Sequence, residues 1–324
     1  MEKFRYQIAN SAQQAASLLS DRSYEETKII AGGVDLVSEL KENLIAPEML
    51  ISITDLDELN YIRSENGSTR IGASTRLIDI ISDENTQSSH TALVEAASVV
   101  GSPQIRNVGT LGGNLCQRPR CWYYRGEFYK CLKKGGAICF SLTGRNKYNC
   151  ILGGGPSYIV HPSDCAPALI ALDATVRLQS PQEQRDMALE EFFTLPTEIL
   201  LRENRLKPDE IVTEVEIPNH SYKSTYIKFR ERDGYDWALS AVAAALELDG
   251  KTCKKANIIL GGVAPIPWRA SQAEELITGK EITEELAAQA GEAAVDGATP
   301  MTDNAYKVPL TKALVKQALL QLTA

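Results

Sequence analysis

The sequence predicts an α+β protein built from two parts. Strand-like apolar stretches and amphipathic helical stretches share a chain of 324 residues, which is long for one core and comfortable for two. Glycine turns occur twice, at Gly32-Gly33 and at Gly112-Gly113, and the first directly follows a strand-like stretch. An alternating stretch ends at Pro218, so we place the main boundary at residues 218–222.

Hydrophobic spacing predicts the individual elements. Helices are expected in the first part at residues 11–19, 34–41 and 91–100. Strands are expected there at residues 28–31, 49–53, 61–63, 69–71, 174–178 and 209–217, the last alternating as an exposed strand would. The second part is predicted as a strand at 224–232, a helix or helix–strand mixture at 236–246, a strand at 255–261, and helices at 271–277, 283–294 and 310–323. Those helices would cover one face of a sheet.

Composition excludes some partners. The formal net charge of -8 argues against a nucleic-acid surface, which needs basic side chains to neutralise phosphates. No apolar stretch approaches the roughly 20 residues that span a bilayer, and the N-terminus leads into no apolar signal core. We therefore expect no membrane contact and a cytoplasmic protein, and in that reducing compartment clustered cysteines are more often metal ligands or redox-active thiols than disulfides.

The two glycine turns are candidate anion sites. Glycines after a strand allow positive φ and leave successive backbone N–H groups open to a phosphate. The turns could bracket a diphosphate, with Thr110 and Asn114 adding side-chain hydrogen bonds, and a Cβ at Gly112 is expected to collide with it. Neither turn is a GxGxxG or GxxxxGK motif, and a strand–helix turn without a ligand is the alternative.

Six of the seven cysteines lie within residues 109–165. Four of them, Cys121, Cys131, Cys139 and Cys150, are separated by nine, seven and ten residues, which is too wide for a CxxC zinc ribbon. Thiolates without histidine partners suit an iron–sulfur cluster or zinc, and ordinary thiols remain possible. Aromatic and basic neighbours would screen a cluster and offset its charge. Cys116 is expected to pack against a ligand pocket, and Cys165 and Cys253 to be structural.

Several ordered motifs together resemble one family. They are AGGVDL at residues 31–36, SPQIRNVGTLGGN at 102–114, KFRER at 228–232 and LGGVAP at 260–265. They are similar to those of the FAD-binding medium subunit of the xanthine oxidase family of molybdenum hydroxylases, over about residues 4–320. The resemblance implies an FAD-binding domain of the vanillyl-alcohol oxidase/PCMH type at residues 1–220, with subdomains at about 1–56 and 57–220. A smaller α+β domain of the CO dehydrogenase flavoprotein type would follow at residues 221–324.

The cysteine-rich insertion indicates which members of this family the chain resembles most. Residues 115–155, called the cysteine segment below, are similar to a loop in the 4-hydroxybenzoyl-CoA reductase beta subunit that binds a 4Fe-4S cluster. The resemblance implies Cys121, Cys131, Cys139 and Cys150 as cluster ligands. Residues 117–121 and 161–164 look more like bacterial aldehyde oxidoreductases, which carry a related loop, so the individual enzyme stays open.

The resemblance also implies a set of FAD-binding residues. Backbone around the pyrophosphate would come from Ile29, Ile30, Ala31, Gly32, Gly33, Val34, Asp35 and Leu36, and from Gly109, Thr110, Leu111, Gly112, Gly113 and Asn114. Gly101 and Ser102 would lie beside the cofactor, Asp164 would hydrogen-bond a ribityl or ribose hydroxyl, and Lys228 would approach the isoalloxazine. Val34 stands where the family usually has Thr, which removes one phosphate contact.

The implied function is electron transfer, with no catalytic residue in this chain. A large molybdopterin-binding partner would perform the substrate chemistry and a small partner would carry 2Fe-2S clusters. FAD and the 4Fe-4S cluster would connect them to an external carrier such as ferredoxin or NAD, in a dimer of heterotrimers. The competing hypotheses are a stand-alone flavin oxidase, for which no substrate cap is visible, and a zinc-binding assembly module with empty glycine turns.

Overall fold

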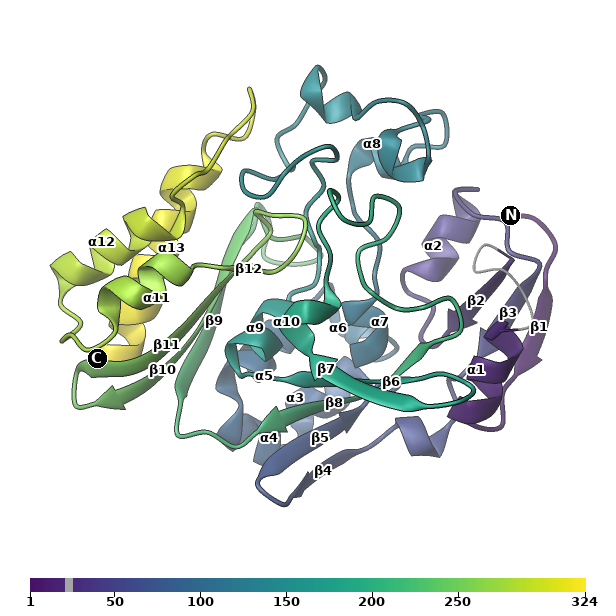
Figure 1. The fold of residues 1–324 in the computed structure, drawn as a ribbon, viewed down its shortest axis with the longest axis horizontal. Helices are drawn as coiled ribbons and strands as arrows, with labels where there is room; N and C mark the ends of the chain where they lie inside the picture. Colours follow the sequence, from purple (N-terminus) through teal and green to yellow (C-terminus); the bar gives the residue numbers. More distant parts are fainter. Residues whose placement is uncertain (21–25) are drawn as a thin grey trace.

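The computed structural model describes residues 1–20 and 26–324, which form three sheets (Figure 1). The first sheet is parallel, in the order β1 (Arg5–Ile8), β3 (Met49–Ser52) and β2 (Thr27–Ile30). It is accompanied by α1 (Ala12–Ser20), which buries Ala15, Ala16 and Leu19, and by α2 (Leu36–Lys41), which follows the first glycine turn. The short 3-10 helix at Asp57–Leu59 leads out of this unit.

The second sheet is antiparallel and has five strands. Its order is β4 (Ile62–Glu65), β5 (Ser68–Gly72), β8 (Ile211–Pro218), β6 (Thr175–Gln179) and β7 (Gln184–Ala188). The expectation that residues 209–217 form an exposed strand is wrong, because β8 is central and pairs on both sides. Its Glu214 is buried because Arg177 of β6 binds it at 2.8 Å.

Seven short helices belong to this second unit in the described part of the chain. They are α3 (Leu77–Ser82), α4 (Glu84–Ser89), α5 (Thr91–Ser98), α6 (Pro103–Arg106), α7 (Leu111–Leu115), α9 (Cys165–Ala171) and α10 (Leu189–Phe192). All residues of α9 are buried, and α5 packs against it. This core therefore supports the start of the cysteine segment at α7 and the chain after its end at α9.

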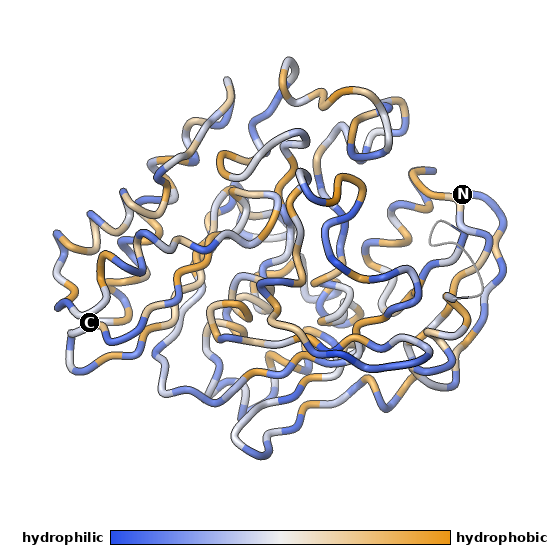
Figure 2. Tube along the Cα trace, viewed as in Figure 1, coloured by the Kyte–Doolittle hydropathy of each residue, from blue (hydrophilic) through white to orange (hydrophobic). Residues whose placement is uncertain are grey.

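The third sheet is antiparallel, in the order β12 (Trp268–Arg269), β11 (Thr252–Gly261), β10 (Ser240–Asp249) and β9 (Lys223–Phe229). The helices α11 (Ser271–Ile277), α12 (Glu284–Ala294) and α13 (Lys307–Thr323) lie together beside it (Figure 1). Hydrophobic residues recur along these helices (Figure 2). Thr283 begins α12 because its hydroxyl oxygen accepts a hydrogen bond from Leu286 N–H.

The prediction of a helix or helix–strand mixture at residues 236–246 is wrong, because residues 240–249 form the strand β10. Alanine favours helices in isolation. Here Ala241, Ala243 and Ala245 pack into the core shared with α5 and α9. Val242, Ala244 and Leu246 pack on the opposite face against the core of α11–α13. A strand buried on both faces has no polar alternation, so its period cannot be recognised.

The cysteine segment contains α8 (Trp122–Arg125) and two 3-10 helices, Leu132–Lys134 and Phe140–Leu142. It lies at the top of Figure 1, above the sheets. Among the helices of the described residues, none combines the length and apolar character that crossing a bilayer requires.

The N-terminal sheet meets the rest of the molecule at the first glycine turn. A Cβ on Gly32 would lie 1.7 Å from the Val108 carbonyl oxygen, so the two backbones are in direct contact. Gly33 has a φ of 70°, in the left-handed region that favours glycine. Side chains are therefore excluded at the first position by packing and disfavoured at the second by conformation.

Replacing Gly32 with Ala should lower the free energy of unfolding by about 3 kcal/mol or more, the upper end of the range for overpacking. The reason is that a backbone oxygen cannot rotate away from the new methyl group. Denaturant unfolding measures this change. Gly234→Ala is the matched control, since a Cβ there meets nothing within 4 Å. Equal stability of both variants would contradict the direct backbone contact.

His90 makes the fold sensitive to acid. Its ring is buried, its Nε2 lies 2.9 Å from Thr69 Oγ1, and burial lowers its pKa to about 4. The unfolded chain, with a pKa near 6.5, therefore binds the proton first as the pH falls.

His90→Gln should make unfolding less pH-dependent between pH 6.5 and pH 4. From the pKa of about 4, wild-type protein should lose up to about 3 kcal/mol of unfolding free energy over this window through His90 alone. Chemical denaturation across this pH range measures the difference. Identical pH slopes for both proteins would refute the prediction.

Candidate functional site

Both glycine turns face one cavity of about 350 Å³, called the glycine cavity. Of the expected cofactor residues, those lining it are Ile29, Ile30, Ala31, Gly32, Gly33, Val34, Asp35, Leu36, Gly101, Gly109, Thr110, Gly112, Gly113 and Asn114. Four others lie outside its lining: Leu111, Ser102, Asp164 and Lys228. Leu111 is fully buried in the core, and Ser102 accepts a hydrogen bond from Ile105 N–H at the start of α6. The two turns, distant in sequence, therefore share one cavity.

The second turn is held by its own side chains. Thr110 Oγ1 accepts a hydrogen bond from Gly113 N–H at 3.2 Å, and Asn114 Oδ1 accepts one from Ser163 Oγ at 2.5 Å. A Cβ on Gly112 would lie 2.9 Å from the Ala73 Cβ, so this glycine allows α7 to pack on Ala73. The expected collision of a Gly112 side chain is therefore with the core, and substitution there would disturb folding first.

Asp35 connects the first turn to the cysteine segment. Its Oδ2 accepts a hydrogen bond from Arg118 N–H at 2.6 Å, and its Oδ1 binds Arg120 Nη2 at 2.9 Å and Arg125 Nη2 at 2.6 Å. Both carboxylate oxygens are thus used within the protein. The Asp35 carboxylate would repel a phosphate, but these cationic partners compensate for its charge.

A second cavity, of about 330 Å³, lies beside Asp164 and is called the aspartate cavity. Asp164 is buried; its Oδ1 accepts a hydrogen bond from Tyr226 OH at 2.6 Å, and its Oδ2 binds Lys228 Nζ at 2.7 Å. Burial, then the Asp164 charge, raises the pKa of Tyr226, which keeps it a donor. The Lys228 side chain is 2 % exposed, lies outside the cavity lining and also donates to the Val99 carbonyl. It therefore holds Asp164 in place.

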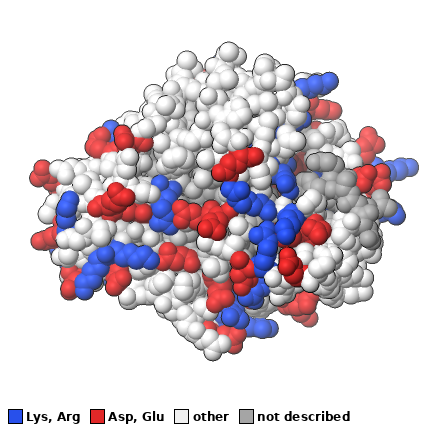
Figure 3. Space-filling model, viewed as in Figure 1, with Lys and Arg blue, Asp and Glu red and all other residues white. Residues whose placement is uncertain are grey.

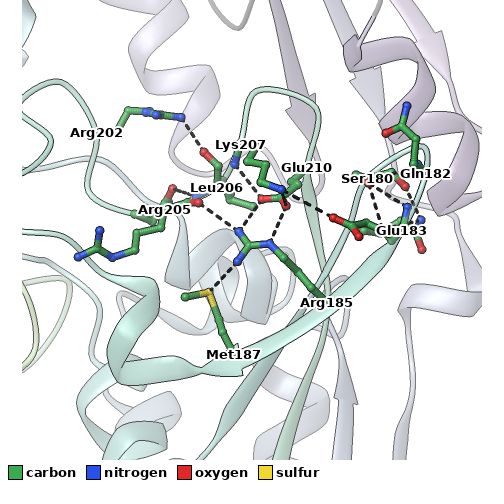
Figure 4. Close-up of polar contacts among 12 residues, drawn as sticks. Ser180, Gln182, Glu183, Arg185, Met187, Arg202, Arg205, Leu206, Lys207 and Glu210 are labelled. Atoms are coloured by element: carbon green, nitrogen blue, oxygen red, sulfur yellow. Dashed lines mark hydrogen bonds and ion pairs between the residues drawn. The ribbon is translucent and has the colours of Figure 1, made fainter.

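The wall of the glycine cavity near Leu206 and Pro208 is fixed by Glu210. Glu210, whose side chain is 1 % exposed, accepts hydrogen bonds from Arg185 Nε at 2.7 Å and Nη2 at 2.9 Å, and from Lys207 N–H at 2.8 Å (Figure 4). A bidentate pair of this kind is stronger than a single contact. Strand β7 thereby supports the loop that closes this side of the cavity.

The cysteine segment is fastened at both ends. Buried Glu203 binds Arg118 Nε near the start of the segment, at 2.6 Å, and Lys133 Nζ in its middle, at 2.9 Å. Near its end, Asn304 donates from Nδ2 to the carbonyl oxygens of Asn149 and Cys150, at 3.1 Å each. The segment is therefore a folded part of the molecule that joins the loops around the glycine cavity to the C-terminal helices.

The four expected metal ligands all lie in this segment, but they do not converge on one point. Within residues 1–20 and 26–324, no three Cys, His, Asp or Glu side chains are close enough to hold a single metal ion. Burial, and to a smaller extent the charges of the neighbouring thiols, raises the pKa of Cys150 to about 12; Cys139 and Cys121 are those neighbours. Three of the four thiols thus influence one another electrostatically, whereas Cys131 is buried beside Lys133.

The expectation that Cys116 packs against a pocket agrees with the structure: it lines the glycine cavity, and burial raises its pKa to about 12. Sequence reasoning did not assign Arg120 and Trp237 to the ligand site, and these two residues line both cavities. The sequence shows basic residues around the cysteines, but no local signal indicates that one of them, Arg120, lines both cavities.

Comparison with known proteins identifies the fold. Residues 2–220 match the FAD binding domain in molybdopterin dehydrogenase, and residues 224–322 match the CO dehydrogenase flavoprotein C-terminal domain. The predicted fold class is confirmed. FAD is the cofactor that the first of these domains binds.

Two relatives are similar to this chain over nearly their whole length. The Escherichia coli (strain K12) aldehyde oxidoreductase FAD-binding subunit PaoB is 31 % identical, over 100 % of this chain and 99 % of PaoB. The carbon monoxide dehydrogenase medium chain of Hydrogenophaga pseudoflava is 28 % identical, over 98 % and 96 %. The solved carbon monoxide dehydrogenase from the same organism matches with a TM-score of 0.78 at 27 % identity, over 98 % and 96 %. The chain therefore belongs to the FAD-binding medium subunits of the molybdenum hydroxylase family of oxidoreductases.

Proposed function

We propose that this chain is the electron-transfer subunit of an aldehyde-oxidising molybdenum hydroxylase. The observation that carries the proposal is the pair of glycine turns around one cavity, which shares the lining residues Arg120 and Trp237 with a second cavity. FAD, when bound, accepts and donates electrons, and the protein positions it and excludes water. The glycine turns would hold its diphosphate, and Asp164 would bind the ribityl or ribose hydroxyls.

The substrate class is taken from the relatives. PaoB, named as a subunit of an aldehyde oxidoreductase, matches this chain from end to end. A glyceraldehyde dehydrogenase medium chain from Sulfolobus acidocaldarius is 28 % identical over 88 % of this chain. 4-Hydroxybenzoyl-CoA reductase is a second candidate, which the resemblance of the cysteine segment favours. Activity assays of the purified complex with aldehydes and with 4-hydroxybenzoyl-CoA distinguish these two candidate functions.

The substrate pocket would lie in a molybdopterin-binding large subunit, and a small subunit would carry 2Fe-2S clusters. The cysteine segment offers a surface for such contacts, because it exposes large apolar side chains: Trp122, Phe128, Tyr129, Ile138 and Leu142. Figure 3 shows few charged side chains over the upper part of this face. The assembly would be a dimer of heterotrimers that passes electrons to ferredoxin or NAD.

A 4Fe-4S cluster in the cysteine segment is the second part of the proposal. Its support is the resemblance of the loop and the four thiols that this one segment supplies, of which Cys131 and Cys150 are buried. Ligands of a cubane surround four irons, so their sulfurs stand farther apart than those around one ion. The described geometry does not form a single-ion zinc site.

Protein purified without oxygen should contain about one FAD and about four irons per chain. Absorbance spectroscopy and metal analysis measure both. FAD without iron would contradict the cluster alone. Zinc without flavin would instead support the assembly-module hypothesis and overturn the electron-transfer proposal.

Cys131→Ala should remove most of the iron and leave FAD bound, because the cysteine is an expected cluster ligand and lines neither cavity. Iron and flavin content of the purified variant are the measurements. Cys165→Ala is the control, since it also removes a buried thiol but lies in α9, outside the cysteine segment. Full iron in the Cys131 variant would exclude this residue as a ligand.

A further inference from the structure

Arg120 of the cysteine segment occupies the boundary between the two cavities. Among the described residues, Arg120 and Trp237 line both the glycine cavity and the aspartate cavity. The guanidinium carbon lies 4.4 Å from the centre of the Trp237 ring, which is a cation–π contact. A molecule that occupied both cavities would therefore lie against this pair.

The guanidinium is held in place but not fully used. Its Nη2 binds Asp35 Oδ1 at 2.9 Å and Gln117 Oε1 at 3.2 Å, and the side chain is 18 % exposed. Its Nε is buried and has no hydrogen-bond partner within the described residues. Because the side chain lines both cavities, an acceptor bound there can approach the N–H donors that Asp35 and Gln117 do not use.

We propose that Arg120 binds FAD, with its guanidinium contacting the diphosphate where the cofactor crosses from the glycine cavity into the aspartate cavity. This inference rests on the proposed function. A planar guanidinium matches the oxygens of a phosphate better than an ammonium does, and contact with Trp237 shields it from water. The first glycine turn already positions it, because Asp35 lies in that turn.

The consequence is that the cysteine segment contributes directly to the flavin site. Arg120 lies next to Cys121, an expected cluster ligand, and Asp35 binds Arg118, Arg120 and Arg125 of the same segment. Folding of this segment therefore completes the flavin site. A chain in which residues 118–125 were displaced should bind FAD weakly even with both glycine turns intact.

The test uses full-length protein from which flavin has been removed, and FAD itself as the probe. Arg120→Gln should raise the Kd for FAD by about 10- to 100-fold, the range expected for loss of a charge-assisted hydrogen bond. It should also flatten the dependence of this Kd on salt concentration, because a cation beside phosphate is lost. Arg120→Lys keeps the charge without the planar group. Its Kd for FAD should therefore lie between those of the wild-type protein and of Arg120→Gln.

Arg125→Gln is the matched control. Arg125 binds the same Asp35 oxygen at 2.6 Å but lines neither cavity, so its loss reports only the weaker anchoring of the segment and should raise the Kd less than Arg120→Gln does. Wild-type affinity in Arg120→Gln, or equal losses in the Arg120 and Arg125 variants, would overturn the direct contact. Wild-type protein that binds no FAD at all would overturn the proposed function as well, which distinguishes the two failures.

Discussion

The close approach of two backbones, at Gly32 and Val108, is the constraint on which the site depends. A Cβ at Gly32 would overlap the Val108 carbonyl, at 1.7 Å, so the N-terminal sheet can dock here only because this residue has no side chain. Docking brings the turn after β2 to the turn before α7, which are far apart in sequence. The glycine cavity is the space that these two turns share.

The cysteine segment joins the three sheets through polar contacts at its two ends. Asp35 binds its first residues to the N-terminal unit, and Asn304 binds its last residues to the C-terminal helices. Buried Glu203 binds two cations of the segment, Arg118 and Lys133. Breaking either ion pair would leave a buried charge without full compensation. These contacts explain how a long insertion with little regular structure keeps one arrangement above the sheets (Figure 1).

Predictions from the sequence succeed where a local signal reports on local structure. The amphipathic helices α11 and α12 and the strand β3 lie within a residue or so of their expected ranges, because each has one buried face or a distinct apolar run. The predicted exposure of β8 and the predicted helix or helix–strand mixture at β10 are wrong, because both strands are buried by partners from elsewhere in the chain. A glutamate such as Glu214 predicts an exposed position, but Arg177 pairs with it and allows it to be buried. The alanines of β10 predict a helix, but the strand is packed between two hydrophobic cores.

The sequence by itself determined the fold class and the glycine motifs that identify an FAD-binding subunit, because these depend on residue types at fixed local spacing. Only the tertiary structure decided how the charged side chains are used. Asp35 binds arginines of the cysteine segment, Lys228 binds Asp164, and Arg120 reaches the boundary of both cavities. The physical reason is that ion pairs form between the charged side chains that packing brings together. Contacts between residues far apart in the sequence leave no periodic pattern in the sequence from which they could be predicted.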